Sequence, residues 1–338
     1  MTLVVAGIGV VVAALVAALL PVPYVILSPG PTLNTLGRTS SGPLITITGH
    51  HTYQTSGHLN LVTVSFLGGP GNGFNVFTAL RAWLTPDTAV VPESELFPSG
   101  QSEQQVVQQD TLQMASSQET AKAAALCTLG IHFTTVDTIT QTEKGLPAAG
   151  VLRPGDVITA VDGTPVSCTQ DTGSLIRAHR AGAPVDLTVV RKGSTEHIRV
   201  KTANVQGHAV IGVFVQESYR FPFPIKISVG NIGGPSAGMM FALGIVDKLT
   251  PGDLTGGKFV AGTGEIAADG AVSPIGGIQQ KMAGARAAGA TIFLTPAANC
   301  SDATGAVPAG LRLAKVSTLR QAINDLAAIK AGRSVPGC

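Results

Sequence analysis

Charged side chains are scarce in this chain: Asp, Glu, Lys and Arg together make up only 12% of its 338 residues. No block of like charge occurs, and the formal net charge is only +2 at pH 7. A nucleic-acid-binding protein usually carries a basic stripe, so nucleic acid is not an expected partner. Hydrophobic residues reach 44%, which excludes a disordered chain and supplies a sizeable core.

Cysteine is also rare, and its positions do not have the spacing of a metal site. The four cysteines are Cys127, Cys168, Cys300 and Cys338. None belongs to a CxxC pair and no histidine cluster has ligand spacing, so we expect neither a metal nor another cofactor. Four buried free thiols and two disulfides both stay open, with three possible connectivities. If disulfides form, the pair Cys300–Cys338 is the first to expect, because it would hold the C-terminus.

Only one stretch of the chain is long and apolar enough to cross a bilayer. Residues 3–20 consist of Leu, Val, Ala, Ile and Gly alone, and apolar character continues to residue 27. About 20 such residues suffice for a spanning helix. We therefore expect residues 1–27 to be a single-pass anchor that contacts lipid over residues 3–27, with the rest of the chain on the extracytoplasmic side of a cell membrane. A cleaved signal peptide is the alternative, although the run exceeds the ~7–15 residues of a signal core.

Residues 131–203 form a separate block of short strand-like runs and tight turns. Its sequence GLPAAGVLRPGDVI at 145–158, followed by VDGTPV at 161–166, resembles a PDZ domain of the bacterial protease-associated kind. A PDZ fold binds extended peptides by adding a strand at a sheet edge. The resemblance implies a carboxylate-binding loop at Leu129-Gly130-Ile131-His132, with the groove extending to Phe133. A PDZ-like spacer without a ligand is the alternative.

A glycine-rich turn presents Ser236 as a candidate nucleophile. The run GNIGGPSAG at 230–238 follows an expected strand and precedes an apolar helix. Free N–H groups at a helix N-terminus favour developing negative charge. We therefore expect the backbone of Gly234-Pro235-Ser236-Ala237 to hold an oxyanion. The alternative is a plain helix cap, a common role of serine.

Lys281 lies on the apolar stripe of a helix expected over residues 277–288. It follows Ile278 by three residues and precedes Ala285 by four. A buried lysine is costly unless it is neutral or paired, and burial lowers the pKa of its amine enough to make a general base. Ser236 and Lys281 could thus form a Ser–Lys dyad. A snorkelling lysine that keeps its ammonium in water is the alternative.

Three blocks in order resemble the proteolytic domain of the Lon protease family: GPSAG at 234–238, TGEI at 263–266 and PIGGIQQK at 274–281. The resemblance gives Ser236 the nucleophile position, Lys281 the base position, and Thr263 the role of orienting the lysine amine. A long helix expected over residues 101–129 and a strand over 59–64 resemble earlier parts of the same domain.

The resemblance therefore implies an α+β fold in which a PDZ domain is inserted in a Lon-type domain. The expected parts are the anchor 1–27, the first part of the Lon-like domain 28–130, the PDZ domain 131–203 and the catalytic part 204–338. This order resembles the membrane-anchored, PDZ-containing Lon-like proteases of Gram-positive and actinobacterial type.

The resemblance implies a serine endopeptidase that cleaves unfolded or flexible exported proteins and peptides, assembled as a ring of six copies. No GxxxxGK[ST] run occurs, so we expect no nucleotide partner. A chymotrypsin-like PDZ protease is a weaker alternative, because the position that its serine nucleophile would occupy is Ile232 in this chain. A catalytically silent PDZ scaffold or peptide receptor at the membrane is the remaining alternative.

Overall fold

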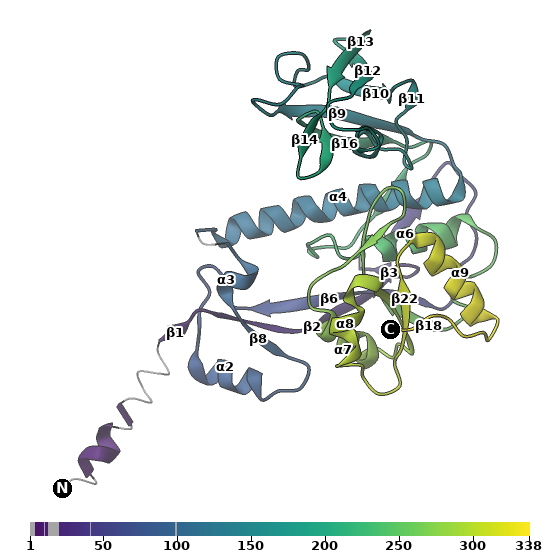
Figure 1. Cartoon of the computed structure of the whole chain (residues 1–338). Coiled ribbons are helices and arrows are strands. Elements are labelled where there is room, and N and C mark those ends of the chain that lie inside the picture. The colour runs from purple at the N-terminus through teal and green to yellow at the C-terminus, as the bar shows by residue number, and fades with distance from the viewer. Residues whose placement is uncertain (1–3, 10, 13–19, 41, 99) are drawn as a thin grey trace.

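The computed structural model describes residues 4–9, 11–12, 20–40, 42–98 and 100–338. Figure 1 shows two bodies on opposite sides of one long helix, α4 (Glu103–Leu129). Ser102 begins this helix with a capping box: its Oγ accepts from the N–H of Gln105, and its own N–H donates to Gln105 Oε1. Gly130 ends the helix at φ 70°, a left-handed conformation that glycine adopts without strain. The helix expected over residues 101–129 is confirmed.

The larger body is built on a six-stranded mixed sheet. Its strand order is β22 (Arg312–Val316), β21 (Ile292–Pro296), β18 (Phe259–Gly262), β6 (His58–Leu67), β2 (Tyr24–Asn34) and β8 (Ala89–Pro92). The first four strands are parallel, whereas β2 runs antiparallel to both of its neighbours.

Helices cover both faces of this sheet, because side chains alternate along each strand. On one face, Leu59, Leu61 and Val260 pack with α4, α6 (Gly238–Leu249) and α9 (Leu319–Lys330). On the other face, Val62 and Phe293 pack with α7 (Ile278–Ala287) and α8 (Cys300–Thr304). Ser236 and Lys281 therefore approach the sheet from helices on opposite faces.

Shorter elements complete the larger body. They are β1 (Pro21–Val22), β3 (Arg38–Thr39), β4 (Gly42–Pro43), β5 (Ile45–Ile47), β7 (Phe74–Asn75), α2 (Val76–Trp83), α3 (Glu93–Leu96), β17 (Ile225–Ile227), β19 (Glu265–Ile266), β20 (Val272–Ser273) and a 3₁₀ turn at Ala297–Asn299.

The smaller body is a PDZ-like sheet with the order β13 (Ser194–Lys201), β12 (Pro184–Arg191), β10 (Val157–Val161), β9 (Thr134–Thr142) and β16 (Val213–Arg220). β11 (Thr164–Pro165) pairs with β10, α5 (Thr172–Arg177) covers the sheet, and β14 (Ala203–Val205) and β15 (His208–Val210) form a hairpin. The sheet of this body continues beyond the expected boundary at residue 203. β16 pairs with β9 from Val213 to Arg220, so this body ends near residue 220.

The anchor boundary at residue 27 is wrong. Tyr24–Leu27 belongs to β2, where Val25 is fully buried and pairs with Val91. An apolar sheet strand here follows directly on an apolar segment, and composition alone does not separate the two. Residues 1–3, 10 and 13–19 of the expected anchor lie outside the described residues; residues 4–9 and 11–12 are helical. Among the residues that the structure describes, no helix has the length and apolar character needed to span a membrane.

All four cysteines form disulfides. Cys300 pairs with Cys338, which confirms the first pairing expected, and Cys127 pairs with Cys168. The second bond joins the last turn of α4 to the loop before α5. It therefore links the helix that supports the larger body to the PDZ-like body.

Phe241 of α6 lies in the core that α4, α6 and α9 form with the sheet. We therefore expect a large loss of stability when its side chain is truncated. Its side chain is fully buried, so Phe241→Ala should lower the free energy of unfolding by about 3–5 kcal/mol. Phe77→Ala is the matched control, because Phe77 is 49% exposed and its loss should cost at most about 0.5 kcal/mol. Chemical denaturation of both variants measures the difference. Equal losses would contradict this description of the core.

Candidate active site

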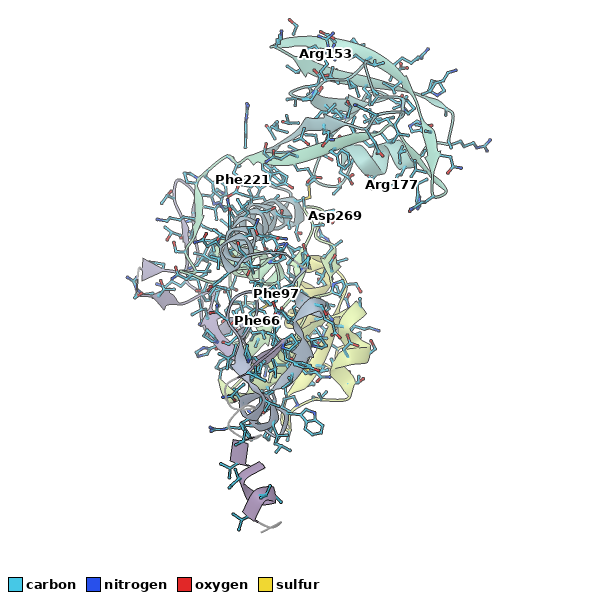
Figure 2. All side chains as sticks on the ribbon, turned by 90° about the vertical axis from the view of Figure 1, so that its left-hand side faces the viewer. Phe66, Phe97, Arg153, Arg177, Phe221 and Asp269 are labelled. Carbon is cyan, nitrogen blue, oxygen red and sulfur yellow. A yellow bond between two sulfur atoms is a disulfide. The ribbon has the colours of Figure 1, made fainter. Side chains whose placement is uncertain are left out.

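Ser236 and Lys281 line the same cleft, which has a volume of about 640 Å³. One wall is the second half of β6, including Thr63, Ser65 and Phe66, and another is the first half of α4 with the segment that precedes it. Figure 2 labels Phe66 and Phe97, which line the cleft on this face of the larger body. The two residues that the sequence predicts for catalysis are thus brought to one hollow from positions 45 residues apart in the chain.

The backbone of Ser236 is held from the sheet side. Ser236 precedes Ala237, the N-cap of α6. Its carbonyl oxygen accepts from the Thr263 hydroxyl at 2.9 Å and from the Gly264 N–H at 2.8 Å. Thr263 is fully buried and directly follows β18. The Thr263 hydroxyl thus supports the backbone of Ser236, and its role in orienting the Lys281 amine stays a prediction.

Helix α4 holds the turn that carries Ser236. The Ser117 hydroxyl donates to the Pro235 carbonyl at 2.8 Å, and the Gly234 N–H donates to the Asp110 carbonyl at 3.0 Å. A Cβ at Gly238 would approach Ser117 Oγ to 3.0 Å and an Ile266 methyl to 2.9 Å. The close approach of β19 and α4 therefore favours glycine at position 238. Sequence reasoning missed Asp110 and Ser117, because a contact across more than 100 residues leaves no local pattern.

The predicted oxyanion segment needs a correction. The Gly234 N–H already donates to Asp110, and Pro235 has no N–H to offer. The N–H groups of Ser236 and Ala237 make no hydrogen bond within the described part of the chain. These two donors at the start of α6 are therefore the ones available to an oxyanion.

Lys281 is buried as predicted, at 4% exposed, on the same face of α7 as Ile278 and Ala285. Burial lowers the pKa of its amine from 10.5 to about 8. No ion pair to Lys281 occurs among the described residues, so desolvation alone causes the shift. This burial argues against a lysine that keeps its ammonium in water.

The PDZ-like body has a second cleft, of about 350 Å³, between α5 and β16. β16 is an edge strand, as strand addition requires. Leu146, Ile176 and Ile211 line the cleft with apolar side chains, whereas Asp137 and Glu217 bring carboxylates to it. The two carboxylates are direct cross-strand partners, and burial raises the pKa of both.

The expected groove at Leu129-Gly130-Ile131-His132-Phe133 is wrong. Leu129, Ile131 and Phe133 pack against the core of the larger body, and Gly130 caps α4. The segment instead connects α4 to β9. The true edge strand carries the alternating run VFVQESY at 213–219 after Ile211-Gly212, a strand signal that lies beyond the expected domain boundary.

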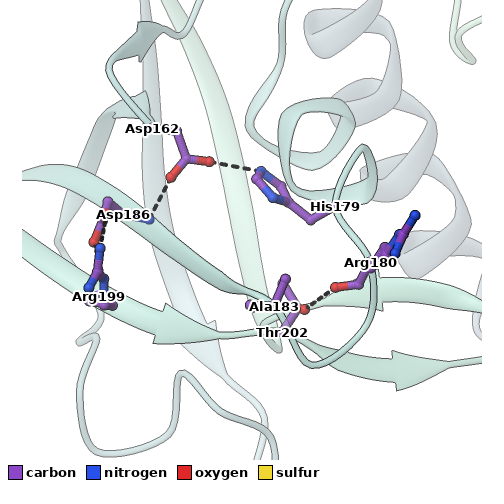
Figure 3. Close-up of polar contacts among 7 residues, drawn as sticks. All are labelled: Asp162, His179, Arg180, Ala183, Asp186, Arg199 and Thr202. Carbon is purple, nitrogen blue, oxygen red and sulfur yellow. Dashed lines mark hydrogen bonds and ion pairs between the residues drawn. The ribbon is translucent and has the colours of Figure 1, made fainter.

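Figure 3 shows polar contacts that hold the segment following α5. His179 Nε2 lies 2.8 Å from Asp162 Oδ2, and the other oxygen of Asp162 accepts from the Asp186 N–H at 2.8 Å. The Thr202 hydroxyl donates to the Arg180 carbonyl at 2.9 Å. These contacts tie the segment after α5 to the sheet and keep the cleft in shape.

Comparison with known proteins matches both bodies. Residues 190–328 match the family model of the Lon protease (S16) C-terminal proteolytic domain, and residues 127–202 match that of the PDZ domain. These matches support a Lon-type proteolytic domain and a PDZ domain in this chain, within a mixed α/β fold.

The relatives are Lon proteases. That of Heliobacterium modesticaldum is 38% identical over 160 residues, which cover 46% of this chain and 18% of that protein. Lon protease 1 of Bacillus subtilis is 37% identical over 142 residues, 40% of this chain and 17% of that protein. The chain spans only 8% to 18% of the length of the curated relatives it matches.

A solved structure, the PDZ domain of the SdrC-like protein from Listeria monocytogenes, is 25% identical and covers 23% of this chain and 85% of that one. Its TM-score is 0.22, so this likeness adds nothing to the assignment of the fold.

Burial of Lys281 predicts that it destabilises the fold at neutral pH. Lowering its pKa from 10.5 to about 8 costs about 3 kcal/mol wherever both states are protonated, at about 1.4 kcal/mol per pH unit. The unfolded chain binds the extra proton between the two pKa values, so the cost is complete below pH 8 and disappears as the pH rises to 10.5. Lys281→Met should therefore raise the free energy of unfolding at pH 7 and not at pH 10.5.

Denaturation at the two pH values checks this expectation, with Lys226→Met as the control because Lys226 is exposed. An equal effect of both substitutions at pH 7 would show that Lys281 is not desolvated.

Proposed function

We propose that this protein is a serine endopeptidase in which Ser236 is the nucleophile and Lys281 the general base. The observation that carries the proposal is that Ser236 and a desolvated lysine line one cleft. A lysine with a pKa of about 8 releases its proton far more readily near physiological pH than a solvated lysine does, and general bases work best with a pKa near the working pH. The matches to the Lon proteolytic domain support the same assignment.

The reaction is acyl transfer in two steps. Neutral Lys281 takes the proton of the Ser236 hydroxyl while Oγ attacks the carbonyl carbon of the scissile bond. The C–N bond breaks, the departing amine takes the proton from Lys281, and the acyl group stays on Ser236. Water then attacks the ester, Lys281 takes its proton, and Oγ leaves with that proton. The N–H groups of Ser236 and Ala237 stabilise the oxyanion in both steps.

The open edge of β6 supports an extended substrate. β18 pairs with β6 only from His58 to Leu61, while β2 pairs with β6 as far as Leu67. Within the described structure, the second half of β6 thus has one free side, and this half lines the cleft. A substrate segment that adds there as a strand must be unfolded or flexible. We propose that such segments are cleaved without nucleotide.

The setting is proposed from the sequence. Residues 3–20 tether the protein to a cell membrane in a single pass, with both bodies on the extracytoplasmic side. The apolar run and the two disulfides, which persist in oxidising compartments, support this placement. By likeness to the Lon family we also propose a ring of six copies.

The dyad predicts the effect of three substitutions on cleavage of a fluorogenic peptide without nucleotide. Ser236→Ala and Lys281→Arg should each lower kcat by about 10³-fold or more, since arginine keeps its proton and the two residues act as one unit. Thr263→Val should cause a smaller loss, because the threonine only supports the Ser236 carbonyl. In the wild type, kcat/KM should rise with pH through about 8 as Lys281 loses its proton.

Lys226→Arg is the control for the lysine substitution, and its activity should equal that of the wild type. Appreciable turnover by Lys281→Arg would refute the base assignment. Absence of turnover in the wild type would favour a catalytically silent scaffold.

The PDZ cleft predicts a separate effect on protein substrates. Gly173 lines the cleft, and the atoms nearest to a Cβ there would be the charged ends of Arg177 and Asp171. Gly173→Phe should therefore narrow the cleft, lowering cleavage of some unfolded proteins while leaving the small fluorogenic peptide unaffected. Thr195→Phe on β13, at the opposite sheet edge, is the matched control. Unchanged cleavage of every protein by Gly173→Phe would identify the PDZ domain as a spacer.

A further inference from the structure

Helix α2 turns its large apolar side chains away from the protein. Its inward positions hold small residues, Thr78, Ala79 and Ala82, of which only Ala82 is buried. The outward apolar face of α2, defined here with the residue that follows the helix, consists of Val76, Phe77, Leu80, Trp83 and Leu84. Phe77 and Leu80 are each 49% exposed, and Trp83 and Leu84 are each 72% exposed. An amphipathic helix normally buries its large apolar side chains, so this inverted arrangement indicates an apolar partner other than the described residues of the chain.

The N-terminal apolar segment leaves the body at the start of this helix. β1 (Pro21–Val22) pairs with β7, with Val22 opposite Phe74 and Pro21 opposite Asn75. Asn75 is the N-cap of α2, accepting from the Thr78 N–H at 3.0 Å. Figure 1 shows α2 at the same end of the molecule as β1 and the N-terminal segment, away from the PDZ-like body. Because these two strands pair, residue 20 lies close to the start of α2.

The chemistry of the helix fits a bilayer surface. Arg81 is the only charged residue between 74 and 86, and it lies in the last turn of α2, where it can approach anionic headgroups. Trp83 is the only tryptophan of the chain, and tryptophan favours the membrane interface. Interfacial helices bury an apolar face to about 5–10 Å at the headgroup boundary.

We propose that α2 docks its outward apolar face into the surface of the bilayer that holds residues 3–20. The inference rests on the membrane tether of the proposed function and adds a second contact to it. The chain runs from α2 through β8 and α3 to Leu96 and Phe97 in the wall of the catalytic cleft. Two contacts with the membrane hold the larger body at one height and tilt, so the cleft keeps a constant position above the bilayer.

The single tryptophan makes the test direct in the unmodified full-length protein. The protein is reconstituted in vesicles of phosphatidylcholine and phosphatidylglycerol, with and without bromine on the acyl carbons nearest the headgroup. Docking predicts that Trp83 emission is about twofold or more weaker in the brominated vesicles than in the unbrominated ones, since the indole lies at the headgroup boundary. Aqueous acrylamide should quench Trp83 emission only weakly in the vesicles.

The control moves the single tryptophan to the PDZ-like body by combining Trp83→Phe with Phe214→Trp, because Phe214 is 54% exposed. This variant should show no quenching by brominated lipid. Vesicle flotation separates the proposed membrane tether from the proposed docking of α2. A chain that does not float has no tether, which overturns both of these proposals. A chain that floats with Trp83 unquenched keeps its tether and overturns docking alone. If Trp83 is shielded from acrylamide in the vesicles but is not quenched by brominated lipid, the face is covered by a second copy of the chain, which overturns docking.

Discussion

Placing an ammonium-bearing side chain inside an apolar helix face is the constraint on which the site depends. Lys281 has no carboxylate partner among the described residues, and desolvation alone shifts its pKa. A solvated or ion-paired lysine would hold its proton at neutral pH and could not act as a base. The rest of α7 compensates for this cost, because Ile278, Met282 and Ala285 pack with Phe293 of the sheet. The core thus keeps the Lys281 amine out of water, where its pKa would be higher.

Helix α4 brings the remaining parts together. Ser117 and the Asp110 carbonyl hold the turn before Ser236, and the same helix packs along α6 in the main core. Its last turn carries Cys127, bonded to Cys168 of the PDZ-like body. A single helix therefore supports the turn that carries Ser236 and is covalently joined to the body that carries the second cleft. Capping at Ser102 and Gly130 stabilises this helix at both ends.

Local sequence patterns predicted the features that depend on residues close together in the chain. The length of α4 followed from its apolar spacing and Gly130, and the burial of Lys281 followed from its place on a helical stripe. The Tyr24–Leu27 strand was mistaken for anchor because an apolar strand and the end of an apolar helix have the same composition. Strand β16 was missed because its partner, β9, lies about 75 residues earlier in the chain. The Asp110 contact that occupies the Gly234 N–H likewise appears only in three dimensions.

Covalent trapping of the nucleophile tests the central claim most directly. The full-length protein is treated with a peptide that carries a serine-reactive fluorophosphonate, and the adduct is located by mass spectrometry across pH 6 to 10. We predict a single adduct on Ser236, formed faster as the pH rises through about 8 and lost in Lys281→Arg. An adduct on another residue, or a rate on Ser236 that does not depend on pH and on Lys281, would contradict the dyad.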